Sequence, residues 1–127
     1  MGKEYISFFI NNFIREQNKE RVRYEFESLK KRNKVMGRFC HNAIEILRKD
    51  RIICRSKKQY HFKDEQLKQE VLLIDMTNHI EGLICSLDNA LQIAENEYMS
   101  TLIIGKDFAY IKEEVSDSDW NIYLLKT

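Results

Sequence analysis

The chain has 127 residues, of which 43% are hydrophobic and 32% charged, with three cysteines. This composition excludes a wholly disordered chain and a disulfide-rich scaffold, and the length suits one domain around one core. No run approaches the ~18 uncharged apolar residues of a membrane-spanning helix, and the first residues do not read as a secretory signal, so we expect a cytoplasmic protein that does not enter a membrane.

The net charge of +1 conceals a division between the two halves of the chain. Residues 1–63 carry 17 basic and 7 acidic side chains, whereas residues 64–127 carry 4 and 13. Such an asymmetry is typical of a surface for nucleic acid or for a charged protein partner. It also arises when two halves fold together and neutralise each other, so both interpretations stay open.

The first 50 residues have the periodicity of helices, and the chain has no proline to break them. One apolar stripe recurs at i, i+3, i+4, i+7 and i+8, and a second begins at Val22 and Phe26. A third pattern covers residues 39–47. We therefore predict helix over residues 5–48, with the first stripe buried in the core. That stripe consists of Ile6, Phe9, Ile10, Phe13 and Ile14.

After residue 50 the pattern changes to short β-branched runs. Residues 51–55 and 59–62 form either a hairpin or a single strand followed by a loop. Residues 71–74 have strand length, and a turn is expected after Asp75. Ser86 is the expected N-cap of a short helix near 87–97. Residues 101–104 and 108–112 make the clearest hairpin, around Gly105–Asp107, and residues 121–125 form the last strand.

This order of elements predicts an α+β fold, in which an N-terminal helical layer packs on a C-terminal, mostly antiparallel sheet. We expect a single domain over residues 1–127. Its helical part is residues 1–50, and residues 51–127 are mostly strands with the one short helix near 87–97.

The sequence offers little for catalysis, cofactors or metal. The glycines form no phosphate-binding loop, and no two cysteines have the C-x-x-C spacing of a metal site. Asp75 and His79 share a face only in a helix, where we expect a turn. We therefore predict no catalytic, cofactor-binding or metal-binding residues. The side chains weighed as metal ligands are Cys40, His41, Cys54, His61, His79 and Cys85.

Nucleic-acid binding is the alternative function. A helix over 35–48 followed by a basic hairpin, with Lys57 and Lys58 at its tip, resembles the recognition helix and wing of a winged-helix protein. Two features oppose it. The helix is apolar at positions such as Phe39 and Ile44, which leaves few side chains to contact bases, and the second half of the chain is acidic.

Four segments together resemble small bacterial proteins encoded beside polymorphic or contact-dependent toxin genes, which are regarded as immunity proteins. The segments are Ser28–Arg32, Arg38–Asn42, Phe108–Ile111 and Tyr123–Lys126. The resemblance implies a non-catalytic cytoplasmic protein that binds and neutralises a cognate toxin domain, for example a nuclease. One departure is the turn Gly105–Asp107, where a turn containing proline is more usual.

If the toxin is a nuclease, its cleft is basic, and an acidic surface on this chain would fit it. Residues 113–119 carry four acids and are followed by the aromatic Trp120, an arrangement typical of a binding hot spot. A solvated hairpin loop explains the same pattern. The expected partner-binding residues are Glu113, Glu114, Asp117, Asp119 and Trp120, with all four acids exposed.

Overall fold

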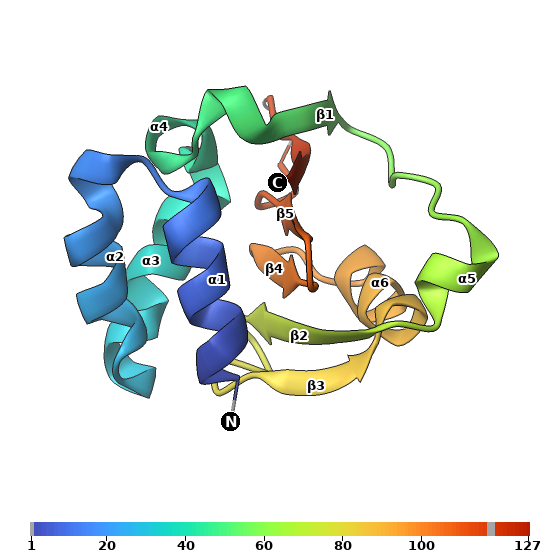
Figure 1. Ribbon diagram of the computed structural model, residues 1–127, viewed down its shortest axis with the longest axis horizontal. Coiled ribbons are helices and arrows are strands. Elements are labelled where there is room, and N and C mark those ends of the chain that lie inside the picture. Colours follow the sequence, from blue (N-terminus) through green and yellow to red (C-terminus); the bar gives the residue numbers. More distant parts are fainter. Residues whose placement is uncertain (1, 117–118) are drawn as a thin grey trace.

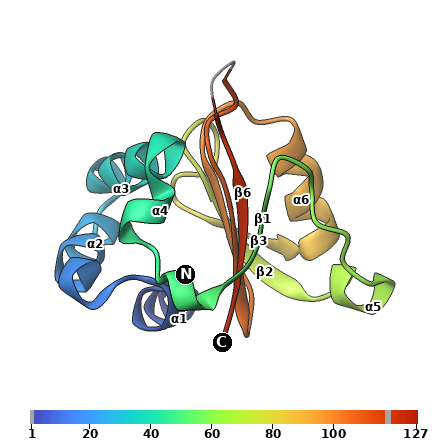
Figure 2. The same cartoon turned by 90° about the horizontal axis from the view of Figure 1, so that it is seen from above.

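The computed structural model describes residues 2–116 and 119–127. A six-stranded sheet, antiparallel at every pairing, lies between two helical layers (Figures 1 and 2). Helices α1 to α4 cover one face of the sheet, whereas α6 and the short α5 lie on the other. The predicted α+β fold, with N-terminal helices on an antiparallel sheet, is therefore confirmed.

The N-terminal layer consists of four helices where the sequence predicted helix throughout. They are α1 (Lys3–Phe13), α2 (Lys19–Phe26), α3 (Leu29–His41) and α4 (Ala43–Ile46), with 3-10 turns η1 (Glu16–Asn18) and η2 (Lys49–Arg51). The chain leaves α1 at Ile14, which is extended and fully buried, and which pairs with Leu47 in an isolated β-bridge. This bridge ties the end of α1 to the end of α4, so a burial contact interrupts the helical pattern without proline or glycine.

The sheet has the strand order β1-β6-β5-β4-β2-β3. Two predicted strands, 101–104 and 108–112, have the bounds observed, and the last lies at 122–126 instead of 121–125. Ser86 accepts a hydrogen bond from the Asn89 N–H and caps α6, as predicted. The strands are β1 (Ile52–Ser56), β2 (Glu70–Asp75), β3 (Leu83–Ser86), β4 (Thr101–Ile104), β5 (Phe108–Lys112) and β6 (Ile122–Lys126); the remaining helices are α5 (Asp64–Leu67) and α6 (Leu87–Glu95).

Residues 51–62 do not form a hairpin. β1 pairs with β6, at the opposite end of the sequence, and residues 57–63 run on as a loop to α5. Of the two predictions for this region, the single strand followed by a loop is correct. The wing of the nucleic-acid-binding alternative is therefore not formed, because Lys57 and Lys58 follow an edge strand of the main sheet.

Side chains of the central strands alternate between two cores. In β2, Leu72 and Ile74 face the helical layer, whereas Val71 and Leu73 face α6. The core under the helical layer contains Phe9 and Phe13, both with no exposed surface, so the first apolar stripe is buried as predicted.

The turn between β4 and β5 depends on glycine. The Gly105 N–H donates to the Phe108 carbonyl, and the Phe108 ring lies against the Gly105 α-carbon. A Cβ at this position would overlap the ring, so glycine is required for close approach. In the part of the chain that the structure describes, no helix has the length and apolar character needed to cross a membrane.

Candidate functional site

The acidic segment after β5 does not present its first acid to solvent. Glu113 is 3% exposed, and its carboxylate accepts hydrogen bonds from the Asn121 N–H at 2.8 Å and from the backbone of Ala43. Burial raises the pKa of Glu113 despite these bonds and the positive charge of Arg55. The expectation that all four acids are exposed is therefore wrong for Glu113, because it ties the start of α4 to β6.

Glu114 is half-buried and faces the end of α3. Its N–H donates to the Cys40 carbonyl, and its carboxylate lies 3.0 Å from Nε2 of His41. The next residue continues this attachment, since the Val115 N–H donates to the Tyr98 carbonyl. Residues 113–115 are thus attached along their length to the helical layer and to the segment after α6.

The residues that end this segment lie apart from the helical layer. Asp119 is exposed and lies 3.4 Å from Nζ of Lys57. Trp120 is partly buried and packs on the core between the sheet and α6. Asp117 lies outside the described residues. The structure therefore separates the predicted residues into a structural pair, Glu113 and Glu114, and two residues beside α6.

Trp120 lines a groove along α6, which we call the α6 groove. It consists of two hollows, of about 330 and 260 Å³, that share Gln59 and Glu95. Aromatic side chains of the 57–62 loop form one wall, and the exposed acids Asp88 and Glu95 of α6 form the other. The principal lining residues are Lys57, Gln59, Tyr60, Phe62, Asp88, Glu95, Tyr110 and Trp120.

The cations at the α6 groove are already engaged. Nζ of Lys112 is turned inward and donates to the carbonyls of Ala94 at 2.5 Å and Glu97 at 2.8 Å, so it satisfies the C-terminal end of α6. Desolvation lowers the pKa of Lys112, although Glu97 and Glu95 oppose this shift. With Lys57 paired to Asp119, the exposed rim of the groove is acidic.

Sequence reasoning missed the α6 contribution to this groove. Asp88, Gln92 and Glu95 recur at i, i+4 and i+7, so they lie on one face of the helix, away from the buried Ala90 and Ala94. This spacing was visible in the sequence. The approach of the 57–62 loop was not, because the contacts join residues about 30 positions apart in the chain.

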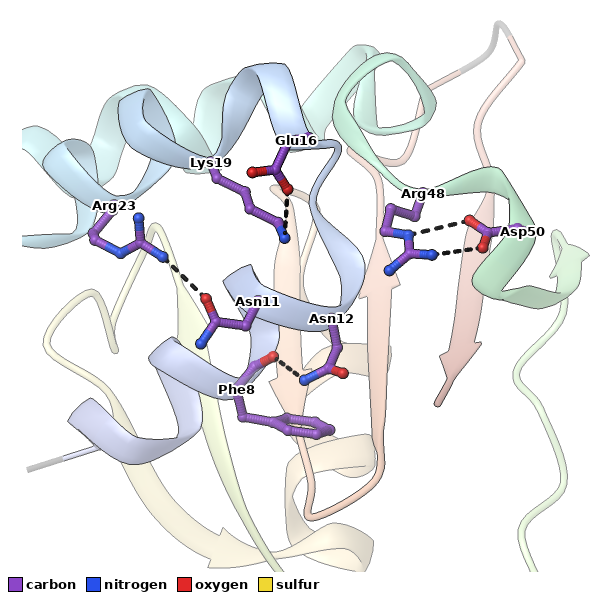
Figure 3. Close-up of polar contacts among 8 residues, drawn as sticks. All are labelled: Phe8, Asn11, Asn12, Glu16, Lys19, Arg23, Arg48 and Asp50. Carbon is purple, nitrogen blue, oxygen red and sulfur yellow. Dashed lines mark hydrogen bonds and ion pairs between the residues drawn. The ribbon is translucent and has the colours of Figure 1, made fainter.

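A separate cleft, which we call the basic cleft, lies on the helical layer. It has a volume of about 700 Å³ and lies between the α1–α2 connection and the segment after α4. Figure 3 shows Lys19 and Arg48, with their partners Glu16 and Asp50, extending toward the end of α1. The lining residues are Arg15, Glu16, Gln17, Lys19, Arg48, Lys49 and Asp50. Sequence periodicity gave no sign of this cleft, because Ile14–Leu47 pairing creates it.

Hydrogen bonds hold Arg15 in the basic cleft, and ion pairs hold Lys19 and Arg48. Arg15 donates from Nε to the Leu47 carbonyl at 2.9 Å and from Nη2 to the Ile44 carbonyl at 3.0 Å. Lys19 lies 2.9 Å from Glu16, and Arg48 makes a bidentate pair with Asp50. Hydrogen bonds from these cations lower the pKa of both carboxyls.

Asp75 and His79 are brought together by a turn. The buried Asp75 carboxylate accepts hydrogen bonds from the N–H groups of Thr77, Asn78 and His79, and it lies 2.7 Å from Nδ1 of His79. The turn was predicted, but the contact was expected only in a helix. These bonds close the β2–β3 connection. Across residues 2–116 and 119–127, no three His, Cys, Asp or Glu side chains are grouped to hold a metal ion.

Comparisons with protein-family models, with curated proteins and with solved structures found no match. The choice among functions therefore depends on the two surfaces described above.

Proposed function

We propose that this chain is a non-catalytic immunity protein, which binds and neutralises a cognate bacterial toxin domain in the cytoplasm. The observation that carries the proposal is the α6 groove, where Trp120 and Tyr60 lie beside the exposed acids Asp88 and Glu95, and where Asp119 pairs with the lining residue Lys57. The sequence resemblance to immunity proteins supports the same function.

The chemistry of this groove suits a basic protein partner. Acidic rim residues accelerate encounter with a positively charged surface, such as the cleft of a nuclease. A large aromatic side chain in a partly enclosed hollow then slows dissociation, because its burial removes water from the contact. The proposed binding residues are thus Asp119 and Trp120, with Asp88 and Glu95 added and the structural pair Glu113 and Glu114 left out.

The nucleic-acid-binding alternative has less support, because the wing that it predicted is not formed. It required a basic hairpin beside the helix over 35–48, and the basic residues in question lie on an edge strand and a loop. The helix itself is divided between α3 and α4, with Phe39 fully buried.

Inspection of the neighbouring genes for a toxin domain, followed by co-expression of that domain with this chain, tests the proposal. The parent chain should restore growth, and the purified proteins should form a stable complex. The triple variant Asp88→Lys, Glu95→Lys, Asp119→Lys should lose protection and associate more slowly. Failure of the parent chain to protect or to bind would refute the proposal.

A matched control comes from the opposite face of the molecule. Glu16, Glu20 and Glu27 are exposed acids of the helical layer, so their replacement by lysine makes the same change in net charge. This triple variant should protect as the parent does. Equal loss in both triple variants would assign the effect to net charge and would remove the α6 groove from the proposal.

A further inference from the structure

The basic cleft, on the opposite layer from the α6 groove, has the features of an anion site. Four cations and two carboxylates line it, which leaves an excess of two positive charges. Its volume of about 700 Å³ falls within the range of ligand sites in proteins, about 300–1,000 Å³. The net charge therefore matches a small dianion.

The cations come from two directions and are held in place. Lys19 directly follows η1 as the first residue of α2, and Arg48 lies just after α4. The two connections are joined by backbone hydrogen bonds from the Arg15 N–H to the Ile46 carbonyl and from the Arg48 N–H to the Phe13 carbonyl. Arg15 uses Nε and Nη2 on backbone carbonyls, and these bonds fix the plane of its guanidinium. A ligand would thus meet preorganised donors with little loss of side-chain freedom.

The carboxylates of the cleft are more exposed than the cations they pair with. The Glu16 side chain is 87% exposed against 21% for Lys19, and the Asp50 side chain is 63% exposed against 32% for Arg48. An incoming anion can therefore displace each carboxylate into water while the cation stays where it is. Lys49 is also exposed and makes no ion pair within the described part of the chain.

We propose that the basic cleft binds a phosphate monoester, carried by a nucleotide or by the 5′ end of an RNA. A monoester bears a charge of about −2 near neutral pH and presents three oxygens. The guanidinium of Arg48 suits two of these oxygens in a bidentate contact, and Lys19 and Lys49 act as point charges beside it.

Calorimetric titration of the full chain at low salt tests this site. Adenosine 5′-monophosphate should bind and adenosine should not. Short single-stranded RNAs with a 5′-phosphate or a 5′-hydroxyl distinguish the two sources: tighter binding of the phosphorylated RNA than of the mononucleotide identifies an RNA end, and the reverse identifies a free nucleotide. Equal binding of the two RNAs without binding of the mononucleotide would overturn the monoester proposal, as would binding of hexaglutamate as tight as that of the mononucleotide.

Two pairs of variants locate the binding. Lys19→Glu with Arg48→Glu should weaken it at least about tenfold, because hydrogen bonds to charged groups are lost. Lys30→Glu with Lys34→Glu makes the same charge change at exposed positions of α3 outside the cleft and should change affinity less than about twofold. Equal losses in the two pairs would overturn the proposal.

Removal of the carboxylates that pair with the cleft cations should increase the affinity for the ligand. Glu16→Gln with Asp50→Asn should tighten binding by about threefold or more, since the ligand no longer displaces an ion pair. Glu20→Gln with Glu27→Gln removes the same charge elsewhere on the helical layer and is the control. No gain over this control would show that the two carboxylates do not occupy the ligand position, and the proposal would fail.

Discussion

The two faces of the sheet are covered unequally. On one face, four helices bury a cluster of aromatic rings, in which Phe9 lies 6.0 Å from Phe39 and 6.4 Å from Phe26, both nearly perpendicular. On the other face, α6 and one loop cover the strands, and Phe62 and Trp120 stay partly exposed at the margin. The fully covered face of the sheet therefore contributes mainly to stability. The partly covered face leaves aromatic side chains exposed beside charged ones, a combination typical of binding sites.

The same comparison explains the charge division of the chain. Most of the basic half forms the helical layer, whereas the exposed acids Asp88 and Glu95 of the second half lie on α6. The sheet lies between the two helical layers (Figure 2), and the two sets meet at points such as Lys57 with Asp119 and His41 with Glu114. Each proposed site takes its charge from the layer on which it lies.

The largest effect is expected under the helical layer. Phe9→Ala and Phe13→Ala each delete a ring with no exposed surface, so each should lower the free energy of unfolding by about 3–5 kcal/mol. Denaturant titration measures this loss. Tyr98→Ala, at a side chain 72% exposed, is the control and should change stability little. Unchanged stability in both phenylalanine variants would contradict the burial of the first stripe.

The next largest effect on stability is expected at Glu113, whereas Asp119, at the other end of the acidic segment, should contribute little. Glu113→Ala leaves the N–H of Asn121 and a backbone group of Ala43 without their acceptor, at a cost of about 1–3 kcal/mol. Asp119→Ala, at an exposed carboxylate, should be nearly neutral. The two variants are compared by thermal and denaturant unfolding. Equal costs would contradict the structural role of Glu113.

Glu113 also gives stability a pH dependence of known sign. Burial holds the pKa of Glu113 above its usual value of 4.5, so the unfolded chain releases this proton first as pH rises. The stability contributed by the carboxyl is complete below pH 4.5 and declines as pH rises through the folded-state pKa. Glu113→Gln removes this titration. The unfolding free energy of the variant, relative to that of the parent, should therefore increase from about pH 4 to pH 7. A difference that stays constant with pH would show that the pKa of Glu113 is not raised by folding.

Sequence periodicity was sufficient where one face of an element is buried and the other is not. The stripe from Ile6 to Ile14 was predictable for this reason. The hairpin around Gly105 is buried on both faces and was predictable from two short β-branched runs that flank a glycine turn. β3 was not predicted, because every residue of Leu83–Ser86 is partly buried and no alternation marks the strand. The burial of Glu113 could not be predicted from the sequence, because one of its partners, Ala43, lies 70 residues earlier in the chain.

Helix capping offers a smaller test, with one cap in each layer. The Ser86 hydroxyl accepts from Asn89 N–H at 3.1 Å, and the Ser28 hydroxyl accepts from Lys31 N–H at 3.3 Å. Replacement of either serine by alanine should cost about 0.5–2 kcal/mol. Ser86→Ala is expected to cost more, because α6 is the main cover of its face. Ser86→Asp, which keeps an acceptor, is the control and should retain most of the stability.

The smallest effect concerns the rim of the α6 groove. Lys57 and Asp119 are 3.4 Å apart with side chains 58% and 78% exposed, so their ion pair should contribute no more than about 0.5 kcal/mol. A double-mutant cycle with Lys57→Ala and Asp119→Ala, measured by denaturant unfolding at low and high salt, gives this coupling. A small, salt-sensitive coupling means that Asp119 can exchange Lys57 for a cation of a partner at little cost. A coupling well above 1 kcal/mol that persists in high salt would make this pair part of the fold, as Glu113 is. The groove would then keep Trp120 as an anchor but lose Asp119 from its acidic rim.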